Sequence, residues 1–289
     1  AINDMKWVKK YNIAAVLYVW QGSMCGGLAC VDVSTRKDNP NGKLADTIAY
    51  DIRDYSSSAN FGGKERNLYK EDLYVGYRYF ETFNKDAVLY PFGYGLSYTT
   101  FEISATGCEK DGKIIVNATV KNTGKYAGKE VVQVYFGAPN GKLGKANKEL
   151  VAYKKTKLLN CGEEETLTIE FDIDKMSAYD DSGITGNKSC YVLEAGQYVI
   201  YVGNSVRASE PVYVHIENET VVTEKCTEAL SPVIEFERLK KGEKGEEVYE
   251  NVPVRTYDIK DRINENLPSE IPYTGNRGIK LEDVKCGRA

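Results

Sequence analysis

The chain has 289 residues, of which 42% are hydrophobic and 28% charged, and its formal net charge is -4. This composition is typical of a soluble globular protein with room for one large domain or two ordinary ones. Acids and bases are interspersed, which argues against a basic surface for nucleic acid. No apolar run approaches the roughly 18 residues of a membrane-spanning helix, so no membrane partner is expected.

The seven cysteines are irregularly spaced and show no pattern of a disulfide framework. No CxxC motif or Cys/His cluster suggests zinc. We interpret the thiols as reduced, which favours a bacterial cytoplasmic location.

The first part of the chain predicts a helix, a strand and a second helix. Asn3 or Asp4 can cap a short helix that runs through Tyr11. Residues 13–20 are continuously apolar, the pattern of a parallel strand covered on both faces. A glycine loop follows, then a short helix through about Val33. Such a strand needs parallel neighbours and only one is found, so we hypothesise that the chain starts in the middle of an α/β domain.

Residues 50–100 are rich in tyrosine and phenylalanine but show no regular period. Connections of this length are uncommon unless they pack on something or serve a function. The stretch is too apolar for a solvated linker, so we expect it to lie irregularly along a domain surface.

From residue 101 to about 216 the hydrophobic pattern changes to period two. Strands are expected at 114–120, 131–136, 166–173, 198–202 and 212–216. Several short alternating strands separated by glycine and asparagine turns predict an antiparallel β-sandwich of immunoglobulin or fibronectin type III kind. After Thr220 the chain becomes charged, which we interpret as a linker.

Serine hydrolase chemistry finds no support in the sequence. Residues 21–25 read Gln-Gly-Ser-Met-Cys, which is not a nucleophile elbow. The single histidine, His215, is predicted on the solvent face of a late strand. No glycine-rich phosphate loop is present either.

A glycosidase needs two carboxyl groups, roughly 5 to 5.5 Å apart for retention and 6.5 to 9.5 Å for inversion. Spacing does not choose among the candidates, and most acids simply face solvent. Glu71 and Asp72 are the most interesting, with an arginine or backbone partner as the alternative, whereas Asp180 and Asp181 are most economically a turn. The full set of candidate acids is Asp32, Asp46, Asp51, Glu65, Glu71, Asp72, Asp180 and Asp181. The residues alone assign no catalytic, cofactor-binding or metal-binding role.

Three segments resemble motifs of glycoside hydrolase family 3. Residues 39–44, Asn-Pro-Asn-Gly-Lys-Leu, resemble its NPSGKLP signature, and residues 69–80 resemble its Y-x-E-x-I-Y-V-G-Y-R-Y-F segment. Residues 89–101 are nearly identical to its PFGYGLSYTTF run. The sequence from Asn122 to Tyr135 resembles the start of its fibronectin type III-like domain. The resemblance covers roughly residues 5–218, in the family's order, which makes it far more specific than a single short motif.

Members of this family pair a TIM-like barrel with an α/β sandwich, and many add a fibronectin type III-like domain. The resemblance therefore implies an α/β fragment, the end of the α/β sandwich, followed by an all-β immunoglobulin or fibronectin type III-like sandwich. Residues 1–55 would be the C-terminal part of the α/β sandwich and 56–100 an extended aromatic-rich connector. Residues 101–218 would be the β-sandwich, and 219–289 a linker toward a missing barrel domain.

The family is retaining and uses no cofactor. Its aspartate nucleophile lies on the barrel, and its acid/base glutamate usually lies in the sandwich upstream of the point where this chain begins. Neither motif is present, so the resemblance transfers no catalytic residue. It implies an oligosaccharide or β-glycoside substrate for the intact enzyme.

Two segments depart from the common pattern. The family often has Pro-Gly-Gln-Glu-Gly-Gly where residues 22–27 read Gly-Ser-Met-Cys-Gly-Gly, which puts an intact loop there in doubt. Residues 271–281 resemble the start of the barrel in members whose domain order is permuted, with the barrel last.

The sequence leaves three hypotheses open. The preferred one is a part of a retaining β-glucosidase-type glycoside hydrolase that is inactive by itself. The second is a non-catalytic accessory or carbohydrate-binding module, in which Trp20, Tyr77 and Tyr79 could stack on sugars, although core packing is the more common role of such residues. The third is a structural β-sandwich for protein association.

Overall fold

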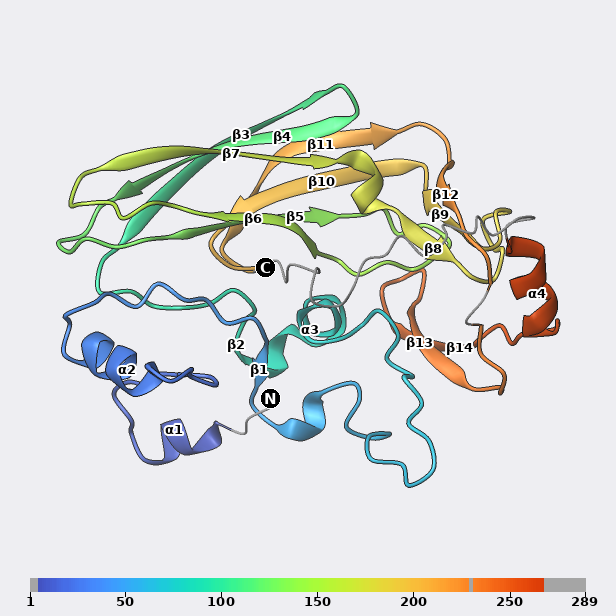
Figure 1. The fold of residues 1–289 in the computed structure, drawn as a ribbon, viewed down its shortest axis with the longest axis horizontal. Coiled ribbons are helices and arrows are strands. Elements are labelled where there is room, and N and C mark those ends of the chain that lie inside the picture. Colours follow the sequence, from blue (N-terminus) through green and yellow to red (C-terminus); the bar gives the residue numbers. More distant parts are fainter. Residues whose placement is uncertain (1–4, 229–230, 268–289) are drawn as a thin grey trace, which may run out of the picture.

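A computed structural model describes residues 5–228 and 231–267 (Figure 1). The N-terminal segments lie along one side of a β-sandwich. A C-terminal hairpin and helix α4 (Ile259–Asn266) lie at one end of the sandwich.

The sandwich consists of two antiparallel sheets. The three-stranded sheet has the order β3-β4-β7, and the four-stranded sheet has the order β11-β10-β5-β6. Their bounds are β3 (Phe101–Lys110), β4 (Lys113–Asn122), β5 (Val131–Gly137), β6 (Glu149–Lys155), β7 (Glu164–Asp172), β10 (Gly196–Gly203) and β11 (Ser209–Glu217). The predicted β-sandwich is confirmed.

The period-two pattern explains why these strands pack as they do. In β4 the side chains of Ile114, Val116, Ala118 and Val120 are fully buried, and the residues between them face outward. Because a one-residue slip would turn every apolar side chain to water, the pattern fixes the register of β4 between β3 and β7.

A second, smaller core lies under the sandwich and is built from the aromatic stretch. Tyr74, Tyr79 and Phe80 pack there with Leu239 and Ala146, which come from distant parts of the chain. The stretch includes the short pair β1 (Ile48–Ala49) and β2 (Val88–Tyr90), and helix α3 (Tyr77–Phe83). The stretch lies along the domain surface as predicted, but its purely irregular character was predicted wrongly, because apolar burial orders α3.

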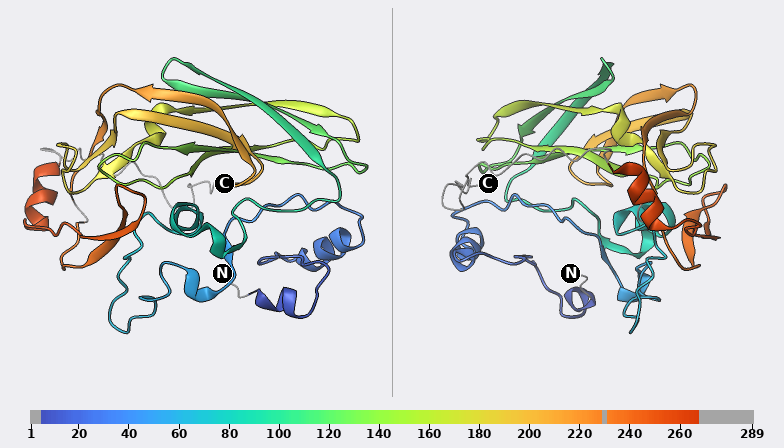
Figure 2. Two further views of the ribbon diagram at one scale, coloured as in Figure 1. Left: turned by 180° about the vertical axis from the view of Figure 1, so that it is seen from behind. Right: turned by 45° about the vertical axis from the view of Figure 1, so that its right-hand side comes forward.

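Residues 13–20 are not a buried strand, contrary to the sequence prediction. They form no strand, and Ile13, Leu17 and Trp20 are 40%, 46% and 50% exposed. A parallel strand requires hydrogen-bonding neighbours, and none is present in the described residues. Both views in Figure 2 show the blue N-terminal part as an extended arm away from the sandwich.

The two predicted N-terminal helices are α1 (Lys6–Lys10) and α2 (Gly26–Ser34). The residue at the N-cap of α1 is Met5, which gives no side-chain cap. The proposed caps, Asn3 and Asp4, lie outside the described residues.

The segment after residue 219 is more ordered than the expected linker. Strand β12 (Val221–Lys225) joins a small sheet with β9 (Cys190–Leu193) and β8 (Ala178–Asp180). Strands β13 (Glu237–Lys241) and β14 (Glu247–Asn251) form a hairpin.

Hydrogen bonds and a buried side chain join the β13–β14 hairpin to the aromatic stretch at residues 50–100. The Lys241 amide donates to the Tyr74 hydroxyl at 2.9 Å, and the Leu239 amide donates to the Lys70 carbonyl. Leu239 is 2% exposed. Thus apolar burial and backbone hydrogen bonds draw residues 237–241 into the second core.

Three further features complete the fold. The short 3-10 helices are η1 (Ile52–Asp54), η2 (Lys85–Ala87) and η3 (Ile173–Met176). The cysteines in the described ranges are free thiols, and Cys286 lies outside those ranges. Within the part of the chain that the structure describes, no helix has the length and apolar character needed to cross a bilayer.

We expect the exposed apolar side chains of residues 13–20 to drive self-association of the purified chain. Contiguous apolar surface and unpaired backbone both favour contact between copies. The double substitution Val16→Asp with Val19→Asp should lower the concentration-dependent mass measured by light scattering. Val233→Asp is the matched control, because Val233 is 66% exposed at a site remote in sequence. A wild-type chain that stays monomeric at all concentrations would refute the expectation.

Candidate functional site

Residues of two family-like motifs meet at a seam between the N-terminal segments and the β-sandwich. Asn39, only 8% exposed, lies at its centre. Its Oδ1 accepts hydrogen bonds from the Ser97 hydroxyl at 2.8 Å and the Tyr98 amide at 2.9 Å, and its Nδ2 donates to the Ala127 carbonyl at 2.9 Å. One buried amide therefore ties three separate chain segments together.

Lys43 forms a second tie across the same seam. Its Nζ lies 2.8 Å from Glu130 Oε1, and the two side chains are 12% and 5% exposed. Glu130 Oε1 also accepts from the Val131 amide, and Oε2 accepts from the Asn204 side chain. The carboxylate is thus hydrogen-bonded as well as ion-paired, which is what a buried charge requires.

The surroundings of Gly93 explain why the Pro-Phe-Gly-Tyr-Gly run has a glycine at this position. Its φ is +79°, and a Cβ there would lie 2.2 Å from Gln133 Oε1. The Gly93 amide donates to the Leu44 carbonyl at 2.8 Å, and the Leu44 amide donates to the Tyr94 carbonyl at 2.8 Å. A side chain there would be strained by the positive φ and would force the buried Gln133 amide to move.

The aromatic candidates divide into two groups. Tyr77 packs on Phe92, with ring centroids 4.5 Å apart, and its hydroxyl accepts from the Leu150 amide. Burial raises the pKa of Tyr77. Tyr79 is 9% exposed, so core packing is confirmed for these two tyrosines. It is wrong for Trp20, which is half exposed and makes an edge contact with Tyr18.

Most candidate acids have an electrostatic or hydrogen-bonding partner. Asp32 pairs with Lys37 at 3.1 Å, and Asp46 Oδ1 accepts from the Thr47 amide. Asp51 pairs with Lys6 and Arg53 and caps η1. The hydrogen bond from Arg53 is the largest cause that lowers the Asp51 pKa. Glu65 is simply exposed.

Glu71 and Asp72 are neighbours with different surroundings. Glu71 is 8% exposed, and its Oε2 has no hydrogen-bond partner in the described part of the chain. Asp72 Oδ2 lies 3.4 Å from Arg238, which also binds Asp181 at 2.6 Å and Glu250 at 2.8 Å. Burial raises the Asp72 pKa, and Arg238 opposes that rise. The arginine-partner alternative is therefore correct for Asp72.

Asp180 forms the predicted turn, whereas Asp181 belongs to the Arg238 cluster. Asp180 is fully buried. Its two oxygens accept from the Gly183 amide at 2.6 Å and from the Thr185 amide and hydroxyl at 2.9 and 2.6 Å. These bonds make the Asp180 carboxylate a structural acceptor.

The prediction of a solvated His215 is wrong. The side chain is 7% exposed, with Nδ1 2.8 Å from Glu109 Oε2 and Nε2 3.5 Å from Glu217 Oε2. Glu109 lies at the end of β3, which packs against β11, so the opposite sheet covers the ring. The period-two pattern of β11 alone does not reveal this cover.

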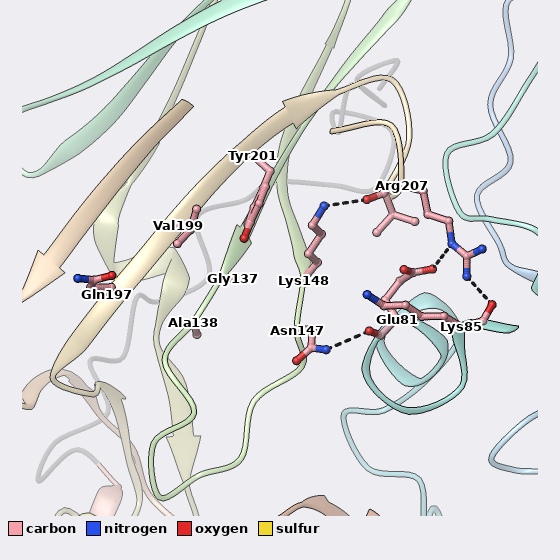
Figure 3. Close-up of a pocket in the computed structure, with 11 residues that line it drawn as sticks. Glu81, Lys85, Gly137, Ala138, Asn147, Lys148, Gln197, Val199, Tyr201 and Arg207 are labelled. Carbon is pink, nitrogen blue, oxygen red and sulfur yellow. Dashed lines mark hydrogen bonds and ion pairs between the residues drawn. The ribbon is translucent and has the colours of Figure 1, made fainter. Parts of the chain in front are cut away.

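A depression of about 640 Å³ lies beside α3 on the outer face of the four-stranded sheet (Figure 3). Glu81 is the one carboxylate among its lining residues and is bound by Arg207 Nε at 2.8 Å. A second depression of about 260 Å³ includes Asp174 and Glu224, both exposed. The larger depression therefore offers no carboxylate pair for glycosidic cleavage.

Sequence reasoning missed this depression, although a signal was present. Gln197, Val199 and Tyr201 occupy the outward positions of β10, and two of them are apolar where polar residues are expected. In the described residues, no group of three or more His, Cys, Asp or Glu side chains is placed to hold a metal ion.

We expect Asn39→Ala to destabilise the seam. The substitution removes three hydrogen bonds of a buried side chain and leaves partly buried partners unsatisfied, which should lower the free energy of unfolding by about 2 to 3 kcal/mol. Urea denaturation measures the change. Asn140→Ala is the control, since its bonds are long, at 3.3 and 3.4 Å, and exposed. Equal losses of stability in the two variants would contradict the importance of the Asn39 hydrogen bonds for the seam.

Asp180 gives a pH-dependent contribution to stability. Burial opposes its ionisation, but hydrogen bonds from Thr185, Gly183 and Ser182 outweigh burial and hold its pKa below 3.8. Because the folded-state pKa is lowered, the contribution is present above pH 3.8 and is lost as the pH falls further. Asp180→Asn should be less stable at pH 7 by about 1 to 3 kcal/mol and less sensitive to acid.

Urea denaturation between pH 3 and 7 tests this expectation. Asp111→Asn is the control, because Asp111 lies in an exposed turn with φ of 51° that asparagine also adopts. Parallel pH profiles for wild type and Asp180→Asn would contradict the assignment.

Comparison with known protein families matches two regions of the chain. Residues 1–98 match the glycosyl hydrolase family 3 C-terminal domain, and residues 130–206 match a fibronectin type III-like domain. The chain is 48% identical over 287 residues to a β-glucosidase of Ruminococcus albus, covering 99% of this chain and 30% of that protein. It is 41% identical to β-glucosidase A of Butyrivibrio fibrisolvens, covering 88% of this chain and 33% of that protein.

Solved structures give the same relationship. A β-glucosidase from Paenibacillus barengoltzii superposes with a TM-score of 0.88 at 50% identity, over 97% of this chain and 33% of that one. β-Glucosidase 3B from Thermotoga neapolitana, solved with α-D-glucose, superposes with a TM-score of 0.65 at 38% identity, over 72% and 28% of the two chains. The chain thus spans about a third of the length of these relatives. It belongs to glycoside hydrolase family 3, with residues 1–98 matching the family's C-terminal domain and residues 130–206 matching the fibronectin type III-like domain.

Proposed function

We propose that this chain is the scaffolding part of a retaining β-glucosidase-type glycoside hydrolase. The intact enzyme would remove terminal β-linked sugars from oligosaccharides or glycosides. Retaining hydrolysis uses one carboxylate as nucleophile and a second carboxyl group first as acid and then as base, roughly 5 to 5.5 Å apart. The relatives' names support the activity, and the arrangement of the described acids supports a scaffolding role.

The observation that carries the proposal is the convergence of family motifs on the seam. Asn39, Lys43 and Gly93 contact backbone and side chains of the β-sandwich rather than an open site. Of the candidate acids, Asp32, Asp51, Asp72 and Asp181 are ion-paired, and Asp180 is a turn acceptor. These segments therefore serve to join two domains.

The proposed division of the chain follows the sequence. Residues 1–55 would complete the α/β sandwich, 56–100 would connect it to the fibronectin type III-like domain at 101–218, and 219–289 would lead toward the barrel. A permuted domain order, with the barrel last, rests on the likeness of residues 271–281 to the start of the barrel in such members, and these residues lie outside those that the structure describes. The free thiols support a cytoplasmic setting.

We expect the purified 289-residue chain to show no hydrolysis of an aryl β-glucoside above a buffer blank. The intact R. albus relative, assayed in parallel, serves as the positive control. Turnover that co-purifies with the chain would contradict the proposal. In that case Glu71→Gln, Asp72→Asn, and the double substitution Asp174→Asn with Glu224→Gln would show which carboxyl groups act.

A further inference from the structure

The outer face of the four-stranded sheet is covered over only part of its area. At β5, Gln133 and Tyr135 are buried beneath the aromatic stretch and are 3% and 0% exposed. On the neighbouring strand β10, Gln197, Val199 and Tyr201 line the depression of about 640 Å³ instead. Pockets for small molecules commonly measure roughly 300 to 1,000 Å³, so the depression is large enough for a short ligand.

One wall of the depression is apolar and contains an aromatic ring. Figure 3 shows Tyr201 and Val199 on β10, with Ala138 at the end of β5 nearby. A Cβ at Gly137 would lie 3.3 Å from Tyr201 Cε2, so the tyrosine ring rests against the bare backbone there. An aromatic ring flanked by aliphatic groups offers a surface for the C–H face of a sugar.

The other wall is cationic. Lys148 Nζ lies 4.2 Å from the centre of the Tyr201 ring and donates to the Val206 carbonyl at 3.1 Å and the Ser209 hydroxyl at 2.8 Å. An ammonium group has three donors, so one remains for a ligand. Among the described residues no carboxylate forms an ion pair with Lys148, although the charges of Glu81 and Glu210 act on it from farther away.

The charges around the depression do not balance. Arg207 is neutralised by Glu81, whereas Lys85 and Lys148 also line the depression. Burial lowers the Lys148 pKa, the charges of Glu81 and Glu210 oppose this, and the charge of Lys85 lowers the pKa further. Each ammonium charge makes the other less favourable, and an anion bound between them would stabilise both charged forms.

We propose that this depression binds the acidic end unit of a saccharide, a uronic acid, with its carboxylate facing Lys148 and Lys85 and its ring against Tyr201 and Val199. The saccharide part of the inference rests on the proposed function, because a carbohydrate-active enzyme meets such ligands. The amide of Gln197 at the far end of the depression would meet a hydroxyl of the next sugar.

The test is calorimetric titration of the full chain with three probes. The first is a glucuronic acid-terminated disaccharide, the second is neutral cellobiose and the third is inorganic phosphate. The proposal expects the acidic disaccharide to bind at least about tenfold more tightly than either of the others, and more weakly at high salt. Equally tight binding of cellobiose would show that the lysines do not contribute to affinity. Equally tight binding of phosphate would show that the site recognises an anion without the sugar ring. Either outcome, or no binding, overturns the proposal.

Two variants locate the binding. Lys85→Glu reverses an exposed charge and should weaken the acidic disaccharide about tenfold or more. Lys148→Met keeps the aliphatic stem and should weaken it further; if this variant does not fold, Lys85→Glu decides alone. Lys175→Glu, an exposed lysine beside the second depression, is the matched control and should change nothing. Unchanged affinity in Lys85→Glu would overturn the proposal. Since binding is measured rather than hydrolysis, its failure is separate from failure of the proposed function.

Discussion

The buried amide of Asn39 is the contact on which the arrangement of the two halves depends. It satisfies two donors at residues 97–98 and one acceptor at residue 127, and all three groups are partly buried. Leaving such groups unsatisfied is more costly than the net gain of an ordinary hydrogen bond. The Lys43–Glu130 pair and the close approach of Gly93 to Gln133 then align the same segments in one register.

This constraint explains how a long aromatic stretch becomes a layer rather than a loop. Once residues 39–44 and 93–98 are held on the sandwich, Tyr77 and Phe92 cover part of the outer face of β5. The remaining apolar side chains of the stretch close the second core with Leu239 of the C-terminal hairpin. The part of the sheet that α3 does not cover becomes the depression with its unbalanced cations. The seam and the depression are thus two consequences of one docking geometry.

The N-terminal arm shows the opposite case, in which apolar sequence lacks a partner. Residues 13–20 have the composition of a buried parallel strand, yet their side chains stay exposed. A parallel strand gains stability only from hydrogen bonds and packing supplied by neighbouring strands. The pattern therefore describes the environment that this segment requires, which the described residues do not provide.

The sequence by itself determined the β-sandwich and its register, because alternating burial in segments such as 114–120 leaves only one face for the core. It also determined the family, because several long runs such as 89–101 that follow the family's order do not arise by chance, whereas a single short motif can. Only the tertiary structure decided the helix at α3, the burial of His215 and the depression at Tyr201. Each of these depends on which distant segment covers a given side chain, as Glu109 covers His215. A local period records which face a residue takes, but it carries no information on what packs against that face.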